Sequence, residues 1–117
     1  MTLYESFWEA VTTEYDTLRV LKQSPRGTVS VVRHKKSGTR YVFRRYSGSG
    51  EVYRRLLPVL CPHLPQIMEA AEQDGQTAVL EEYVQGDTLA ELLMGARLTE
   101  REARQVTMQL CQALHVL

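Results

Sequence analysis

Hydrophobic residues near the start of the chain recur first at the spacing of a helix and then at the spacing of strands. Leu3, Phe7, Trp8 and Val11 form one stripe of a short amphipathic helix over residues 3–13. The segments that follow are rich in β-branched and aromatic residues, and the short links between them contain proline or glycine. We predict three consecutive antiparallel strands, at residues 17–22, 28–34 and 40–46.

The middle of the chain predicts a second helix and a second hairpin. Ser49 can cap a helix that begins near Gly50 or Glu51, and Pro58 is expected to leave that helix short or distorted. The pair Asp74-Gly75 is the strongest turn signal in the sequence. It predicts a hairpin of two strands, residues 66–72 and 77–84.

Two further helices are predicted at the end of the chain. Asp87 or Thr88 caps a short leucine-rich helix, and Thr99 and Glu102 form a capping box that opens a long one. No glycine or proline stops the long helix, so we expect the native chain to continue and this helix to offer an apolar face for self-association. The apolar stripe consists of Val106, Leu110, Ala113, Leu114 and Leu117.

This order of elements predicts an α+β fold with a five-stranded, mostly antiparallel sheet, one helix packed on it and flanking helices. The 117 residues suffice for one modest core. We divide them into an N-terminal helical extension (residues 1–14), a sheet-and-helix region (residues 15–84) and distal helices (residues 85–117).

Composition excludes several classes of function. No apolar run approaches the roughly 20 residues of a membrane span, and the acidic start does not resemble a signal peptide. Cys61 and Cys111 lie far apart, without the spacing of a metal site, so we expect a reducing cytoplasm. His63 and His115 have no carboxylate or cysteine at ligand spacing, and we interpret both as structural.

Charge is balanced overall but unevenly distributed. The chain has 14 basic and 14 acidic residues, yet residues 15–60 hold eleven basic and two acidic ones. A basic first half can attract phosphate, or it can be a solvated sheet face balanced by the acidic second half. Exposed aromatic residues between the basic ones are few, so we do not expect a nucleic-acid partner.

The segments LKQSPRGTV (residues 21–29) and YVFR (residues 41–44) stand in an order and at a spacing that resemble the N-terminal lobe of a eukaryotic-type protein Ser/Thr kinase, in a bacterial style. Residues 21–29, LKQSPRGTV, stand where that family has its glycine-rich loop, and only Gly27 and Val29 match it. Fifteen residues after Val29, YVFR stands where the family has VAIK, so Arg44 replaces the lysine that holds the phosphates of ATP. Glu51 is the best match for the helix glutamate that orients this cation.

The resemblance continues to the end of the chain. Residues 62–70 are similar to the stretch around the family's HPNIV motif, and residues 79–93 to its hinge. In that alignment Glu81 is the gatekeeper, and the Glu82 carbonyl and Val84 amide would contact adenine. Residues 98–117 resemble the helix that leads into the HRD catalytic loop.

The resemblance implies an ATP-binding lobe, with Mg²⁺ and phosphoryl transfer to a protein substrate supplied by an intact parent. These 117 residues contain no HRD or DFG, so we expect no catalytic residue and no metal ligand among them. The cofactor-binding residues that it implies are Gly27, Val29, Val42, Arg44, Glu51, Glu82 and Val84.

Alternatives remain open at this level. Lys22 and Ser24 replace two loop glycines, which favours weakened ATP binding or a pseudokinase-type scaffold without transfer activity. Gly27 can simply serve a hairpin, and Arg44 can be a solvated strand arginine. A carboxylate at Glu81 must be solvated or paired with a neighbour such as Arg44 or Arg45, in competition with phosphate.

Overall fold

The computed structural model describes residues 2–117 and forms two compact units. The first unit holds the residues up to Val59 together with Gln66–Tyr83, and the second holds Leu60–Pro65 and Val84–Leu117. In chain order the elements are α1 (Leu3–Glu14), β1 (Tyr15–Ser24), β2 (Gly27–His34), β3 (Arg40–Ser47), α2 (Glu51–Leu56), β4 (Ile67–Gln73), β5 (Gln76–Glu82), α3 (Leu89–Gly95) and α4 (Glu100–Val116).

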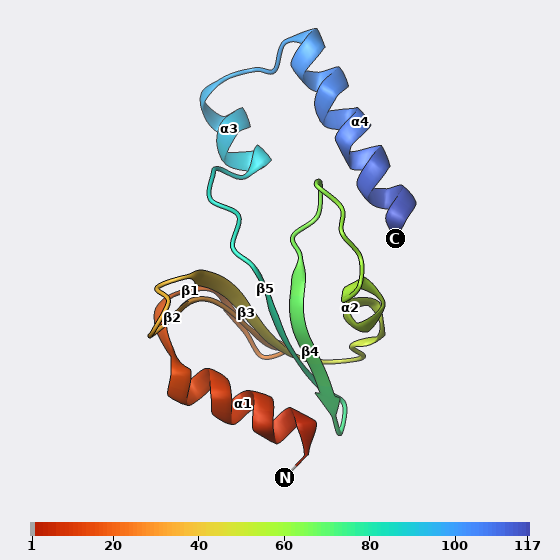
Figure 1. Cartoon of the computed structure of the whole chain (residues 1–117). Coiled ribbons are helices and arrows are strands. Elements are labelled where there is room, and N and C mark those ends of the chain that lie inside the picture. Colours follow the sequence, from red (N-terminus) through yellow and green to blue (C-terminus); the bar gives the residue numbers. More distant parts are fainter. Residues whose placement is uncertain (1) are drawn as a thin grey trace. The chain divides into compact units, whose positions relative to one another are not determined.

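The first unit is built on one five-stranded sheet with strand order β1-β2-β3-β5-β4 (Figure 1). Each neighbouring pair is antiparallel, which confirms the predicted meander and the second hairpin. Asp74 and Gly75 both have positive φ in that hairpin turn, as its Asp-Gly sequence predicts. The last strand ends at Glu82, so extending it to residue 84 was wrong.

Helix α1 covers one face of the sheet and supplies two of the seven buried residues of the core on that face (Figure 1). Phe7 and Val11 are buried against Val32, Phe43 and neighbouring strand residues. The rings of Phe7 and Phe43 meet edge to face, with centroids 5.9 Å apart. Of the predicted stripe, Phe7 and Val11 pack into the core, whereas Leu3 is exposed and Trp8 is only partly covered.

Helix α2 lies beside β4 and helps to cover the opposite face (Figure 1). It is six residues long and ends before Pro58, as predicted. Its N-cap is Gly50 rather than Ser49: the Gly50 amide donates to Glu72 Oε1 at 2.7 Å, and a side chain at Gly50 would lie within 2.8 Å of Thr77. The Ser49 hydroxyl accepts from the Glu51 amide at 3.2 Å, so the predicted serine and a carboxylate on β4 each satisfy one amide at the start of α2.

The second unit holds α3 and α4, and both begin at the predicted caps. Thr88 accepts from the Glu91 amide, and Thr99 and Glu102 form the reciprocal capping box. Leu110 and Leu114 on the apolar stripe of α4 are exposed. Within residues 2–117, no helix is long and apolar enough to cross a membrane.

Candidate functional site

Three residues from three strands form one row across the face of the sheet opposite α1. Val29 on β2 is the register partner of Lys22 on β1 and also of Arg44 on β3. Directly paired residues of antiparallel strands present their side chains on the same face. The register therefore aligns two cations on either side of a valine, although the three residues are far apart in sequence.

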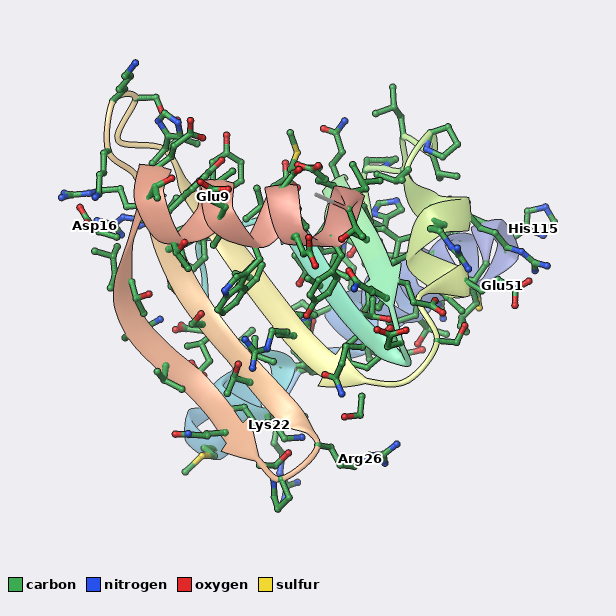
Figure 2. The ribbon with its side chains drawn as sticks, turned by 90° about the horizontal axis from the view of Figure 1, so that it is seen from below. Glu9, Asp16, Lys22, Arg26, Glu51 and His115 are labelled. Atoms are coloured by element: carbon green, nitrogen blue, oxygen red, sulfur yellow. The ribbon has the colours of Figure 1, made fainter. Side chains whose placement is uncertain are left out.

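This row borders an open cavity of about 270 Å³ below the β1–β2 turn. Gly27 and Ser24 line it at the turn, and Tyr46 and Tyr53 line it from β3 and α2. Figure 2 shows Lys22 and Arg26 at this turn of the sheet. The full lining is Lys22, Ser24, Arg26, Gly27, Thr28, Val29, Arg44, Arg45, Tyr46, Ser47 and Tyr53, a set with four basic residues and no acidic one.

The four basic residues do not contribute equally. The guanidinium carbon of Arg45 lies 4.4 Å from the centroid of the Trp8 ring, on the face that α1 covers. Because successive strand residues point to opposite faces, Arg44 is directed to the cavity side and Arg45 away from it. The cationic side chains available at the cavity are therefore those of Lys22, Arg26 and Arg44.

Gly27 has a structural reason to be glycine. A Cβ at this position would lie 2.1 Å from the Arg45 carbonyl oxygen and 2.7 Å from the Tyr46 Cα. Gly27 and Tyr46 are register partners, so the absence of a side chain lets the start of β2 approach β3 this closely. The interpretation of Gly27 as a hairpin residue is thus supported, and it also lines the cavity.

Arg44 forms an ion pair with Glu81 on β5. Its Nε and Nη2 lie 3.0 Å and 2.9 Å from the same oxygen, Glu81 Oε1. The Arg44 side chain is 36% exposed and that of Glu81 only 8%. Burial alone lowers the pKa of Arg44, but the hydrogen bond and charge of Glu81 outweigh burial and raise that pKa above its ordinary value.

The expected pair between Arg44 and Glu51 is not formed among residues 2–117. The Glu51 carboxylate instead receives Arg55 at 2.7 Å, four residues along the same helix. Glu51 is 60% exposed, and Figure 2 shows it on α2. Helix α2 begins at Glu51, so the side chain stands on the first turn, where its charge is favourable to the helix.

The remaining predicted site residues do not line this cavity. Val42 is buried between Val31 and Glu81, its register partners on β2 and β5. Glu82 ends β5, and its amide donates to the Gln66 carbonyl at 2.8 Å. Val84 follows the strand and is exposed. Of the seven predicted residues, the structure brings together Gly27, Val29 and Arg44.

The acidic residues do not gather into a metal centre in the part of the chain described. Among residues 2–117, no three or more His, Cys, Asp or Glu side chains are grouped so that they could hold a metal ion.

No family model matches the chain, and no curated protein sequence does. Solved structures do match it. Two crystal structures of the Mycobacterium tuberculosis PknI kinase domain superpose with TM-scores of 0.67 and 0.66, at 19% identity over 89% of this chain. A crystal structure of Rad53 in complex with AMP-PNP superposes with a TM-score of 0.75, at 16% identity over 90% of this chain.

The chain has the fold of a protein kinase N-terminal lobe. It spans 47% and 48% of the PknI chains and 30% of the Rad53 chain. The antiparallel five-stranded sheet and its helix are the elements that the kinase N-lobe resemblance predicted, which confirms the α+β fold class. Within this kinase N-lobe fold, Arg44 and the β1–β2 turn lie at one cavity, and Arg44 is paired with a strand carboxylate.

Proposed function

We propose that this chain is the nucleotide-binding lobe of an ATP-dependent protein Ser/Thr kinase and that Lys22, Arg26 and Arg44 bind the phosphates of ATP. The observation that carries the proposal is the cavity below the β1–β2 turn, which three cationic side chains face and no acidic residue lines. Cationic donors in a partly enclosed site favour a polyphosphate over a neutral ligand. The AMP-PNP complex of the similar Rad53 fold agrees with this choice of ligand.

The residues around the cavity fit phosphate in two ways. Gly27 has no side chain that would cover the backbone at the turn. Val29 lies between Lys22 and Arg44 in the register, a spacing at which both cations can contact one anion. Two further requirements of phosphoryl transfer, Mg²⁺ binding and removal of the substrate proton, would depend on other parts of the parent protein. Mg²⁺ ligands and the base that accepts the substrate proton belong to motifs that these 117 residues do not contain.

Calorimetric titration of the chain with Mg-ATP tests this function. We expect a dissociation constant in the millimolar range or tighter, weakened about tenfold or more in Arg44→Ala, because hydrogen bonds between charged groups contribute roughly 1.5–3 kcal/mol each. Arg40→Ala is the matched control, since Arg40 is an exposed arginine of the same strand that does not line the cavity. Equal affinity of Arg44→Ala and the unaltered chain would remove Arg44 from the proposed role.

The second candidate is a pseudokinase-type binding or scaffold module without transfer activity. The Arg44–Glu81 pair favours it, because a buried carboxylate already offsets the charge of Arg44 and engages two of its nitrogens. The turn also carries the side chains of Lys22, Ser24 and Pro25, and these hinder the approach of phosphate to the backbone amides more than glycines would. A melting temperature that does not rise with Mg-ATP, in a chain that is otherwise folded, would select this candidate.

A further inference from the structure

We propose that Glu81 is the positioning residue of Arg44, in the place that the kinase resemblance gave to Glu51. The inference rests on the proposed function, because it concerns how Arg44 is oriented toward phosphate. This positioning role differs from the expectation, drawn from the sequence, that pairing of Arg44 with Glu81 would compete with phosphate binding. Three observations support it: the donors of Arg44 that the pair leaves free, the burial of Glu81, and the separate pairing of Glu51 with Arg55.

The pair with Glu81 uses only part of the hydrogen-bonding capacity of Arg44. A guanidinium has five N–H donors, of which the pair with Glu81 uses one on Nε and one on Nη2. Three donors remain, including both on Nη1. Arg44 can therefore hold Glu81 with one edge and donate to a phosphate oxygen with the rest, so the pair and the anion are compatible.

Glu81 is held inside the sheet. Its residue is 6% exposed, and Val42 and Ile67 flank it as register partners on β3 and β4. Both Arg44 donors converge on the same carboxylate oxygen, and Val42 lies two residues before Arg44 on β3. The carboxylate and the guanidinium are thus diagonal neighbours on adjacent strands, an arrangement within reach of long side chains. Two adjacent strands fix this geometry without any helix.

Glu51 lacks these properties. It stands on a six-residue helix without buried residues, its carboxylate is already paired with Arg55, and its side chain is mostly exposed. The other side chains that influence the charge of Arg44 are the phenols of Tyr46 and Tyr53, and neither is a carboxylate. Glu81 is therefore the carboxylate that orients the cation, and the orientation does not depend on α2.

Binding of inorganic tripolyphosphate to the 117-residue chain, measured by calorimetry, tests the inference. Two opposed effects make the sign of the result decisive. Glu81→Gln removes a negative charge beside Arg44, which would tighten anion binding if charge alone mattered. It also frees the guanidinium to adopt other rotamers, which weakens binding if orientation matters. We expect Glu81→Gln to weaken tripolyphosphate binding about tenfold, and the matched Glu51→Gln to change it less than twofold.

The outcomes separate the inference from the proposed function. Weaker binding in Glu81→Gln with a circular dichroism spectrum like that of the unaltered chain supports the positioning role. Equal or tighter binding in Glu81→Gln, or a loss in Glu51→Gln of similar size, overturns it while leaving the phosphate site intact. If the unaltered chain does not bind tripolyphosphate, both the inference and the proposed function are overturned.

A second measurement needs no change at Glu81. In the unaltered chain, the NMR signal of the Arg44 Nε–H group, assigned by its disappearance in Arg44→Lys, reports the hydrogen bond to Glu81. We expect slow exchange of this proton with water both before and after tripolyphosphate is added. Fast exchange in the bound state would show that phosphate displaces Glu81, and the positioning role would then be abandoned.

Discussion

Breaking the Arg44–Glu81 pair is expected to lower the free energy of unfolding by more than the loss of a surface ion pair does. Exposed pairs contribute about 0.2–1 kcal/mol. Removal of one partner from a fully buried pair costs about 3–5 kcal/mol. Glu81 is 8% exposed and Arg44 36% exposed, so the pair lies between these limits. We expect Glu81→Gln and Arg44→Met each to cost about 1–3 kcal/mol.

The double variant isolates the interaction. Removing both partners leaves no unpaired charge, so the double variant should lose less than the sum of the two single losses, with a coupling energy of about 1–2 kcal/mol. Urea unfolding followed by the fluorescence of Trp8 reports on the correct unit, because Trp8 is the single tryptophan and its ring lies 5.9 Å from that of Phe43.

The Glu51–Arg55 pair is the matched control within the same chain. It is an exposed i,i+4 pair, for which a coupling of about 0.3–0.5 kcal/mol is expected. Salt should weaken the control pair more than the Arg44–Glu81 pair, since partly buried charges are screened less. A coupling energy for Arg44–Glu81 no larger than that of the control would refute the reasoning from burial.

Four other predictions address the core, the turn and the distal helices. Gly27→Ala should lower stability by about 1–3 kcal/mol in urea, because its Cβ would meet the Arg45 carbonyl; unchanged stability would contradict the close approach of β2 to β3. Phe43→Ala should cost about 3–5 kcal/mol in the same assay, because Phe43 is buried against α1, and a loss below 1 kcal/mol would place it outside the core. Leu110→Glu with Leu114→Glu should abolish the self-association that we expect from the exposed face of α4; sedimentation that is the same for variant and unaltered chain argues against that face. The amide and hydroxyl of Thr99 lower the pKa of Glu102 below its ordinary value of 4.5, so the capping contribution is complete above that pH and is lost as pH falls through the lowered pKa. Helical circular dichroism should show this acid loss, and Glu102→Gln should lack it.

Local sequence signals determined the order of the elements, and they placed the ends of the strands to within two residues. The capping box at Thr99, the turn at Asp74-Gly75 and the stop before Pro58 depend on atoms within a few residues of one another. Such signals can be read without knowing the fold. The collinear resemblance to kinase N-lobes added the arrangement of these elements, and the superpositions on kinase domains confirm it.

The start of α2 and the end of β5 also depend on contacts across the sheet, which local sequence does not show. Ser49 accepts from the Glu51 amide as its sequence position suggests, but the amide of the N-cap residue, Gly50, donates to the carboxylate of Glu72, 22 residues away in sequence. Tyr83 and Val84 continue an apolar pattern, but the last register partners along β5 are Ile67 on β4 for Glu81 and Tyr41 on β3 for Glu82. A strand ends where its pairing with neighbouring strands ends, and that pairing cannot be read from one segment of the sequence.

The sequence by itself placed Arg44, Gly27 and Val29 as candidates for one site, because their spacing along the chain resembles that of kinase phosphate-binding residues. Only the tertiary structure decided which carboxylate pairs with Arg44. Glu51 is seven residues from Arg44 and Glu81 is 37, but the β3–β5 register makes Glu81 its diagonal neighbour. Register is fixed by packing of whole strands, so an ion pair across strands emerges only when the sheet is assembled.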